Sequence, residues 1–377
     1  MSHVGHKFII MPVNSLSDIA REAGVSRRTV TAVINPETSR RHVSKRAAEK
    51  VKAILEKTGY LPSYAALRLR RSAADIAGIL QTTFLSQHVH QAVNSIFYQL
   101  TETDVNIETI STRPVKSAEG LKKLISRGVR RVIWILEADS AEQIISENLH
   151  LITALAEGRR IIIYNYPFGQ NPKLEKTLTA SGIYLIGINR PRSYHRLGKF
   201  LIKTGYKAVL LPLLKNHVNE KKLQDDVSHL NSYKNKIAAA LKKTGIAVYC
   251  GHPVNMPYRM PGEYGKDFFD ALVRQVRELE HCAVCAGDDI FAARIISEMA
   301  LRRILVPQDA AVIGQDNLAW CEYFKPGITS LGIPVQKMVN NTLTLLNKEH
   351  SKKRYEYTME IIPRQSHRSI HCSLKCS

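Results

Sequence analysis

The stretch LSDIAREAGVSRRTVTAVIN, residues Leu16–Asn35, decides the fold of the N-terminal part of the chain. Ser15 and Asp18 form a capping box ahead of apolar residues that recur with the spacing of one helix face, and Gly24 ends this helix. Ser26 follows two residues later and can accept a hydrogen bond from the free amides of a second helix. Two helices joined by a tight glycine turn predict a helix-turn-helix.

A third helix is predicted to complete this small bundle. It begins near Val43 and Ser44, and Gly59 ends it. Residues 1–61 are therefore expected to form one helical domain. The apolar positions of the third helix are Ala47, Val51, Ile54 and Leu55.

The second helix has an outward face near its start, which is where a recognition helix places the side chains that reach base edges. An arginine there suits guanine, because its planar fork matches two acceptors of the major groove and gives ~1–3 kcal/mol of discrimination. Basic residues around the next loop and helix start can contact phosphates. The alternative is that these are solvated charges on a helical bundle. The outward residues are Arg27, Arg28, Thr31 and Ala32, and the basic ones are Arg40, Arg41, Lys45 and Arg46.

The chain is strongly basic and long enough for more than one domain. Its 377 residues carry 54 Lys and Arg against 33 Asp and Glu, a net charge of +21. This excess favours polyanionic partners, either nucleic acid or an anionic membrane surface. The length fits one small and one large domain, since a domain usually has ~100–200 residues.

Other features of the sequence exclude several classes of protein. No apolar run approaches the ~18 residues of a membrane span, and the first residues lack a signal-peptide pattern. We therefore expect a cytoplasmic, bacterial, nucleoid-associated protein without a membrane partner. Cys282 and Cys285 are predicted to be buried core thiols, and His88 and His90 to lie at the surface or at a helix cap. No metal, cofactor or catalytic signature is found, so no enzymatic activity is expected.

From residue 74 onward, short apolar runs alternate with amphipathic stretches. Alternation of buried strands and helices predicts parallel sheets with helices on both faces, an α/β fold. The number of strands favours two doubly wound lobes over one sheet. The predicted strands are Ile76–Leu80, Val105–Ile110, Val129–Leu136, Arg160–Tyr164, Tyr184–Ile188, Ala208–Leu211, Ile246–Cys250, Cys282–Ala286 and Ala310–Ile313.

Three blocks in the first 70 residues resemble the DNA-binding segment of the lactose-repressor and galactose-repressor family. They read LSDIAREAGVSRRTVTAVIN, VSKRAAEKVKAILEKTGY and LPSYAALRLR. The resemblance implies a DNA-binding transcriptional regulator, with repression as the expected effect. The positions that match the DNA contacts of the family are Ser15, Ser26, Arg27, Arg28, Thr29, Thr31, Ala32, Asn35, Arg41, Tyr64, Ala66, Leu69 and Arg70.

Residues 62–73 resemble the hinge helix of that family. A helix this short rarely persists in water, so it is expected to order only with DNA and a second protomer. In the family a leucine at the position of Leu69 is wedged into the minor groove, which kinks the duplex. The chain departs from the family at Ala32, Ser63 and Leu67, where Arg, Asn and Arg are usual. Ala32 removes one base contact, so operator preference is expected to rest more on Arg27 and Arg28.

Weaker landmarks of the family follow in order through residues 74–377. They imply a sensor domain like a periplasmic sugar-binding protein, with three crossovers between its lobes. The expected N-terminal lobe is about 74–190 and 315–345, and the C-terminal lobe about 191–314 and 346–377. The landmarks are Ile79–Phe84, Gly187–Asn189, Cys285–Asp288, Val312–Asn317, Thr329–Pro334 and Ile361–Ser366.

Ligands of open α/β sheets lie beyond the carboxyl ends of the strands, which places the predicted effector site between the lobes. Asn165, Tyr233 and Gly287 replace the usual Asp, Arg and Asn of the family. Each polar residue there could instead cap a turn or helix. The positions that match the effector cleft of the family are Phe84, Ser86, Asn165, Tyr233, Asp288, Gln315 and Asp316.

The leading hypothesis is a homodimer that binds double-stranded, near-palindromic operator DNA and responds to a small, sugar-like effector. The alternative is a DNA-binding protein whose sensor domain binds no small molecule and serves dimerisation or a protein partner. A third hypothesis, an enzyme that carries a helix-turn-helix, lacks a catalytic motif to support it.

Overall fold

The computed structural model describes residues 15–34, 42–58, 76–83, 86–103, 105–212, 214–216, 227–250, 254–256 and 266–368. The chain divides into two compact units, residues 1–73 and 74–377. No helix among the described residues is long and apolar enough to cross a membrane.

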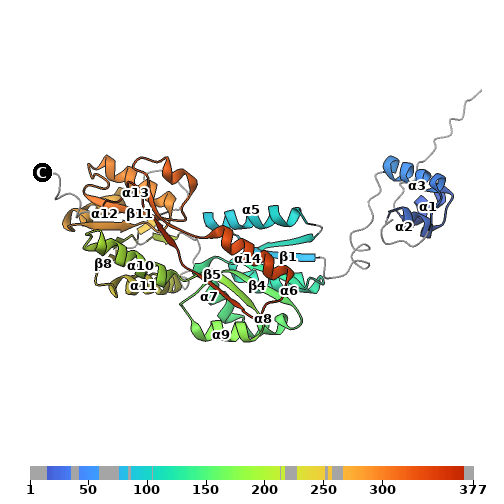
Figure 1. Cartoon of the computed structure of the whole chain (residues 1–377), viewed down its shortest axis with the longest axis horizontal. Helices are drawn as coiled ribbons and strands as arrows, with labels where there is room; N and C mark the ends of the chain where they lie inside the picture. Colours follow the sequence, from blue (N-terminus) through green and yellow to red (C-terminus); the bar gives the residue numbers. More distant parts are fainter. Residues whose placement is uncertain are drawn as a thin grey trace, which may run out of the picture. The chain divides into compact units, whose positions relative to one another are not determined.

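The described residues of the first unit form three helices, α1 (Leu16–Ala23), α2 (Arg27–Ile34) and α3 (Lys45–Thr58) (Figure 1). One fully buried side chain from each helix forms the centre of its core: Ile19, Val30 and Val51. Gly24 has a φ of 64°, a left-handed conformation that suits glycine, and its amide bonds back to α1. The predicted helix-turn-helix and third helix are confirmed.

The first lobe of the second unit is a six-stranded parallel sheet with the order β13-β5-β4-β3-β1-β2. Successive residues of its central strands belong to two different buried clusters, so helices cover both faces. Its strands are β1 (Ile76–Thr82), β2 (Asn106–Thr112), β3 (Arg131–Ile135), β4 (Arg160–Pro167), β5 (Tyr184–Ile188) and β13 (Arg354–Tyr357). Its helices are α5 (Gln87–Thr101), η3 (Pro114–Lys116), α6 (Ser117–Ser126), α7 (Ala138–Glu147), α8 (Leu149–Ala156), α9 (Pro172–Ala180) and α14 (Val335–Asn347).

The second lobe repeats this topology with the order β14-β12-β11-β10-β6-β8, in which only β14 is antiparallel to its neighbour among these described strands. Its strands are β6 (Ala208–Leu211), β8 (Ala247–Cys250), β10 (Cys282–Cys285), β11 (Ala310–Gln315), β12 (Thr329–Gly332) and β14 (Glu360–Ile362). Its helices are α10 (Arg190–Lys203), α11 (Val227–Lys242), α12 (Lys266–Glu278), α13 (Asp289–Leu301) and η5 (Ala319–Glu322). β7 (Leu214–Asn216) pairs separately with β9 (Val254–Met256).

The predicted α/β architecture of two doubly wound lobes is confirmed, and each of the nine predicted strands is present. The chain crosses between the lobes three times, after β5, between β12 and α14, and between β13 and β14. The expected lobe boundaries are wrong in two segments. β12 pairs with β11 in the second lobe, where it lies between β11 and β14, and β13 pairs with β5 at the edge of the first sheet. Each short strand joins a sheet through backbone pairing with residues far away in the sequence.

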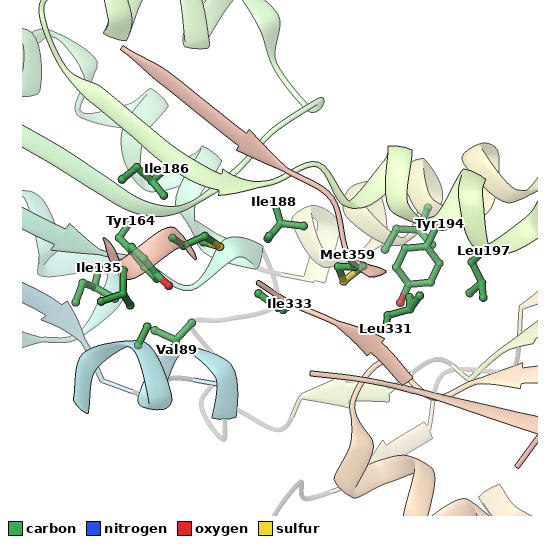
Figure 2. Packing of buried hydrophobic residues seen from close by; sticks show 14 of the residues in the cluster. Val89, Ile135, Tyr164, Ile186, Ile188, Tyr194, Leu197, Leu331, Ile333 and Met359 are labelled. Carbon is green, nitrogen blue, oxygen red and sulfur yellow. The ribbon is translucent and has the colours of Figure 1, made fainter. Parts of the chain in front are cut away.

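The three crossovers meet in one hydrophobic cluster. Ile188, Ile333 and Met359 come from one crossover each, and all three are buried. Figure 2 shows these residues between Tyr164 of the first lobe and Tyr194 of the second. The second unit, which we call the sensor unit, therefore has an apolar core that is continuous through the three crossovers, which form its hinge.

Candidate functional site

The first candidate surface is the start of α2. Arg27 and Arg28 are exposed there, as predicted for residues that reach base edges. Ser26 fixes the start of the helix, because its Oγ accepts a hydrogen bond from the Thr29 amide at 3.1 Å and lies 2.9 Å from Thr29 Oγ1. The Thr31 hydroxyl donates to the Arg27 carbonyl at 3.0 Å. Ser26, Thr29 and Thr31 thus hold the backbone that presents the two arginines.

Ser15 plays the same part for α1. Its Oγ accepts from the Asp18 amide at 3.2 Å and donates to Asp18 Oδ2 at 2.6 Å. Lys45 and Arg46 are exposed at the start of α3, where basic side chains suit phosphate contacts.

The prediction that Ala32 lies on the outer face of α2 is wrong. Ala32 is 6% exposed. An alanine side chain extends only one carbon from the backbone, so neighbouring groups cover it easily. Ala32 is therefore no longer a candidate for base contact.

Several predicted positions lie outside the described residues. For Tyr233 the structure describes the backbone, which belongs to α11, but not the side chain. The others are Asn35, Arg41, Tyr64, Ala66, Leu69, Arg70 and Phe84.

The second candidate site follows the carboxyl ends of the parallel strands, where open α/β sheets bind ligands. A chain of polar contacts runs there from β4 in the first lobe to the loop after β11 in the second. We call it the cleft network; its members are Ser86, His88, Glu137, Asn165 and Asp316.

Ser86 stands at the N-cap of α5, but its side chain does not cap the helix. Its amide donates to Glu137 Oε2 at 2.9 Å, and its hydroxyl donates to Glu137 Oε1 at 3.1 Å. The same hydroxyl lies 3.1 Å from Nδ1 of His88. Glu137 follows β3, so this carboxylate ties the start of α5 to the neighbouring strand end.

Asn165 was expected after the fourth strand but lies inside β4, at an irregularity in its pairing with β5. Its φ is 66°, and its side chain is fully buried. Nδ2 donates to the Leu136 carbonyl at 3.0 Å, while Oδ1 has no hydrogen-bond partner among the described residues. The bulge turns the amide toward the ends of the strands, where an alternating strand would not place it.

Asp316 and Gln315 follow β11 in the second lobe, and both are nearly buried. Asp316 has a φ of 101°, and its Oδ1 lies 2.9 Å from His88 Nδ1, although the pair lacks the geometry of a hydrogen bond. Gln315 Oε1 accepts from the Tyr194 hydroxyl at 3.3 Å. The close approach of His88 and Asp316 joins the two lobes.

Asp288 acts as a helix cap, the structural alternative considered for the polar cleft positions. Its Oδ1 accepts from the Phe291 amide at 2.7 Å at the start of α13. The adjacent Asp289 is fully buried, where it accepts from Ser330 Oγ at 2.6 Å and from the Leu318 amide at 2.8 Å. Burial raises the pKa of Asp289 to about 6, although these hydrogen bonds act in the opposite direction.

The two-cysteine pair is part of the core, as predicted. Cys282 and Cys285 are buried in β10, and burial raises the pKa of each thiol to about 12. Across the described ranges, no group of three or more His, Cys, Asp or Glu residues could hold a metal ion.

Sequence reasoning missed three polar residues of the cleft. His88 was expected at the surface or at a helix cap, but it is 2% exposed. Thr82 ends β1 and Glu137 follows β3, so the rule that ligands lie beyond strand ends could have identified both. The position of His88 in the sequence does not indicate that it contacts Asp316.

Comparisons with known proteins agree with this architecture. Residues 15–63 match the lacI family of bacterial regulatory proteins, and residues 213–367 match a periplasmic binding protein-like domain. The chain is 23% identical over 367 residues to the HTH-type transcriptional repressor PurR of Vibrio parahaemolyticus, covering 95% of this chain and 99% of that protein. It is 24% identical over 329 residues to the ribose operon repressor of Escherichia coli, covering 86% and 89%.

A crystal structure of the lac repressor dimer bound to operator and the anti-inducer ONPF has the same fold, with a TM-score of 0.66 and 17% identity. The alignment covers 94% of this chain and 99% of that one. The first matched segment lies in the helical unit, and the second lies in the two-lobed unit. The chain is therefore similar over nearly its whole length to DNA-binding transcriptional repressors, and its N-terminal unit matches the lacI family of bacterial regulatory proteins.

Proposed function

We propose that this regulator binds a near-palindromic operator as a homodimer and is switched by a small hydroxyl-bearing ligand in the cleft between its lobes. The proposal of a ligand rests on a set of buried polar atoms that have no hydrogen-bond partners among the described residues. They include Thr82 Oγ1, His88 Nε2, the Tyr164 hydroxyl and Asn165 Oδ1. A buried polar group without a partner costs ~1–3 kcal/mol, and a ligand can remove that cost.

The chemistry of the cleft favours a neutral ligand with several donors. Glu137 and Asp316 contribute carboxylates, and Asn165 contributes an amide oxygen. Hydroxyl groups can donate to all of these, whereas an anion would be repelled by the carboxylates. A sugar or a related polyol therefore fits better than a small acid.

The His88–Asp316 contact supports a switch. It joins α5 of the first lobe to the loop after β11 of the second, so a ligand that competes for either side chain changes the balance between lobe arrangements. A coupling of ~1–3 kcal/mol changes the affinity for the operator about 5- to 150-fold.

Operator recognition is assigned to Arg27 and Arg28, which are exposed on a helix whose start is fixed by Ser26. Two such helices in a dimer would meet two half-sites about one turn of DNA apart.

A second candidate function is DNA binding without a small ligand. The core of the sensor unit is continuous across the hinge, and His88 already contacts Asp316. Both features favour a sensor that is stable in one arrangement and serves dimerisation or a protein partner.

A ligand screen with the full chain distinguishes a regulator that is switched by an effector from one that binds no small ligand. Thermal unfolding is followed with sugars, polyols, nucleosides and small acids, and a true effector raises the Tm in a concentration-dependent way. The Asn165→Ala variant should lose this shift, while Glu157→Gln, a change at an exposed residue, should keep it. The effector proposal fails if no compound raises the Tm, or if the shift survives in Asn165→Ala.

Operator recognition is tested separately by selection of duplexes from a random pool. A palindromic consensus supports the dimer, and a pool that stays random at physiological salt contradicts the proposal.

A further inference from the structure

A basic groove of about 410 Å³ lies beside the hinge of the sensor unit, apart from the cleft network. We propose that it is a second ligand site, which binds a small molecule through phosphate groups. The proposal goes beyond the effector cleft, because none of the lining residues belongs to the cleft network. The groove is lined by Arg192, Arg196, Lys352, Arg354, Glu356 and Thr358.

The fold brings these side chains together from both lobes. Arg192 and Arg196 are four residues apart on α10, so they lie on one face of the helix, and both are exposed. Arg354 and Glu356 are alternate residues of β13, so they lie on one side of that edge strand, and Lys352, two residues before the strand, also lines the groove. The groove is therefore a shared surface of the second lobe, through α10, and the first lobe, through β13.

The charges in the groove are only partly neutralised. Arg354 contacts Glu356 and lies 3.1 Å from Glu175, and Arg192 is 3.9 Å from Glu356. Glu356 is also held by the Asn189 amide at 2.9 Å. Glu175 and Glu356 therefore already form ion pairs with Arg354 and Arg192.

The other two cations have no carboxylate within 4 Å among the described residues. Arg196 donates to the Thr358 hydroxyl at 2.9 Å, and Lys352 Nζ lies 5.0 Å from the centre of the Tyr355 ring. Together with half-exposed Arg354, they leave the groove with an excess of positive charge. An anion with more than one negative charge would neutralise it.

The residue types favour phosphate over a single carboxylate. A guanidinium presents paired N–H groups that match phosphate oxygens, and an ammonium adds a compact charge. A phosphate ester or pyrophosphate group bound between α10 and β13 would contact both lobes at once. Its binding would therefore stabilise the lobe arrangement that brings these cations together.

The concave, two-lobed lining favours a small ligand over a nucleic-acid strand. On α10 the basic residues continue outside the groove as exposed Lys199 and Lys203, on the same face as Arg196. A strand of nucleic acid would follow this longer stripe, whereas a small phosphate compound would depend only on the groove. The two lysines therefore provide a matched control.

The test measures binding of inorganic pyrophosphate to the full chain by calorimetry at physiological salt. The double variant Arg196→Gln/Lys352→Gln should raise the Kd at least tenfold, while Lys199→Gln/Lys203→Gln should change it less than twofold. Unliganded Tm values are measured for both variants, and Arg196→Lys should recover part of the affinity if charge alone accounts for some of the binding.

Three results would overturn the proposal. The first is absence of pyrophosphate binding to the unmodified chain. The second is an equal loss of affinity in both double variants, which indicates a general response to surface charge. The third is loss of affinity for a random-sequence duplex in both variants without any pyrophosphate binding, which assigns the whole stripe to nucleic acid.

Discussion

The proposed DNA-binding surface and the cleft network present polar chemistry in opposite ways. At the start of α2 the functional groups are exposed, and the buried residues beneath them are apolar. In the cleft the functional groups are themselves buried, and Asn165 is held by a bulge and His88 by contacts from both lobes. A surface that reads DNA can therefore change its side chains with little effect on folding, whereas the cleft cannot.

The largest expected effect on stability comes from a substitution at Gly187, where β5 closely approaches β4 beside Asn165. A Cβ on Gly187 would lie far inside contact distance of the Tyr166 backbone, next to the bulge. Gly187→Ala should lower the free energy of unfolding of the sensor unit by about 3 kcal/mol, because backbone cannot move aside as a flexible side chain can. Chemical unfolding measures the difference.

Gly287→Asn is the matched control for this change. Gly287 has a φ of 91° and open space around its Cβ position, and Asn is both the usual residue of the family there and tolerant of a left-handed backbone. Its effect should stay within about 1 kcal/mol. Equal destabilisation by the two changes would show that the approach to Tyr166 is not the constraint.

Asp289 is a buried polar group whose contribution to stability should depend on pH. Its folded-state pKa of about 6 exceeds the ordinary value of 3.8, so the folded protein holds this proton more tightly than the unfolded chain. Its contribution to stability is full below about pH 4 and is lost as the pH rises through 6, by at most about 3 kcal/mol. Stability measured from pH 4 to pH 7 should fall more steeply in the unmodified chain than in Asp289→Asn. Parallel profiles would contradict the assignment.

The sequence predicted the helix-turn-helix and the central strands because each depends on neighbouring residues. Ser15 and Asp18 are three residues apart, and strands such as Tyr184–Ile188 are continuous apolar runs. The short strands β12 and β13 have no such run, and which sheet each joins depends on distant pairing. The lobe boundaries were misassigned for that reason.

The cleft was predicted less completely, because its contacts join distant parts of the chain. Ser86 and Glu137 are separated by 51 positions, and His88 meets a residue of the other lobe. Asn165 was placed in the right region, but its left-handed backbone and its position inside β4 could not be read from alternation. Ala32 shows the converse, since helical spacing alone overestimated its exposure.

Arg28→Ala tests the exposed side of the comparison. Because Arg28 is exposed, the change should leave the Tm nearly unaltered, while preference for the selected operator over random duplex falls by ~1–3 kcal/mol, about 5- to 150-fold. Weak, salt-sensitive binding should remain through phosphate contacts.

Arg28→Lys keeps the charge but loses the planar fork, so it should retain general affinity and lose most of the preference. Footprinting that shows an unchanged protected site for Arg28→Ala would remove Arg28 from the recognition surface.

Ser15→Ala has the smallest expected effect. It tests whether a polar group at the edge of the helical unit stabilises the fold or contacts DNA. The Ser15 hydroxyl bonds to Asp18 in two ways at the start of α1, and removal of such a cap costs ~1 kcal/mol. Ser15→Thr retains both the acceptor for the Asp18 amide and the donor to its carboxylate, so it should restore most of the loss, measured by thermal unfolding of the full chain. If Ser15→Ala instead reduces operator affinity with no change in Tm, Ser15 contacts DNA directly, and this edge of the helical unit uses its polar groups for recognition rather than for folding.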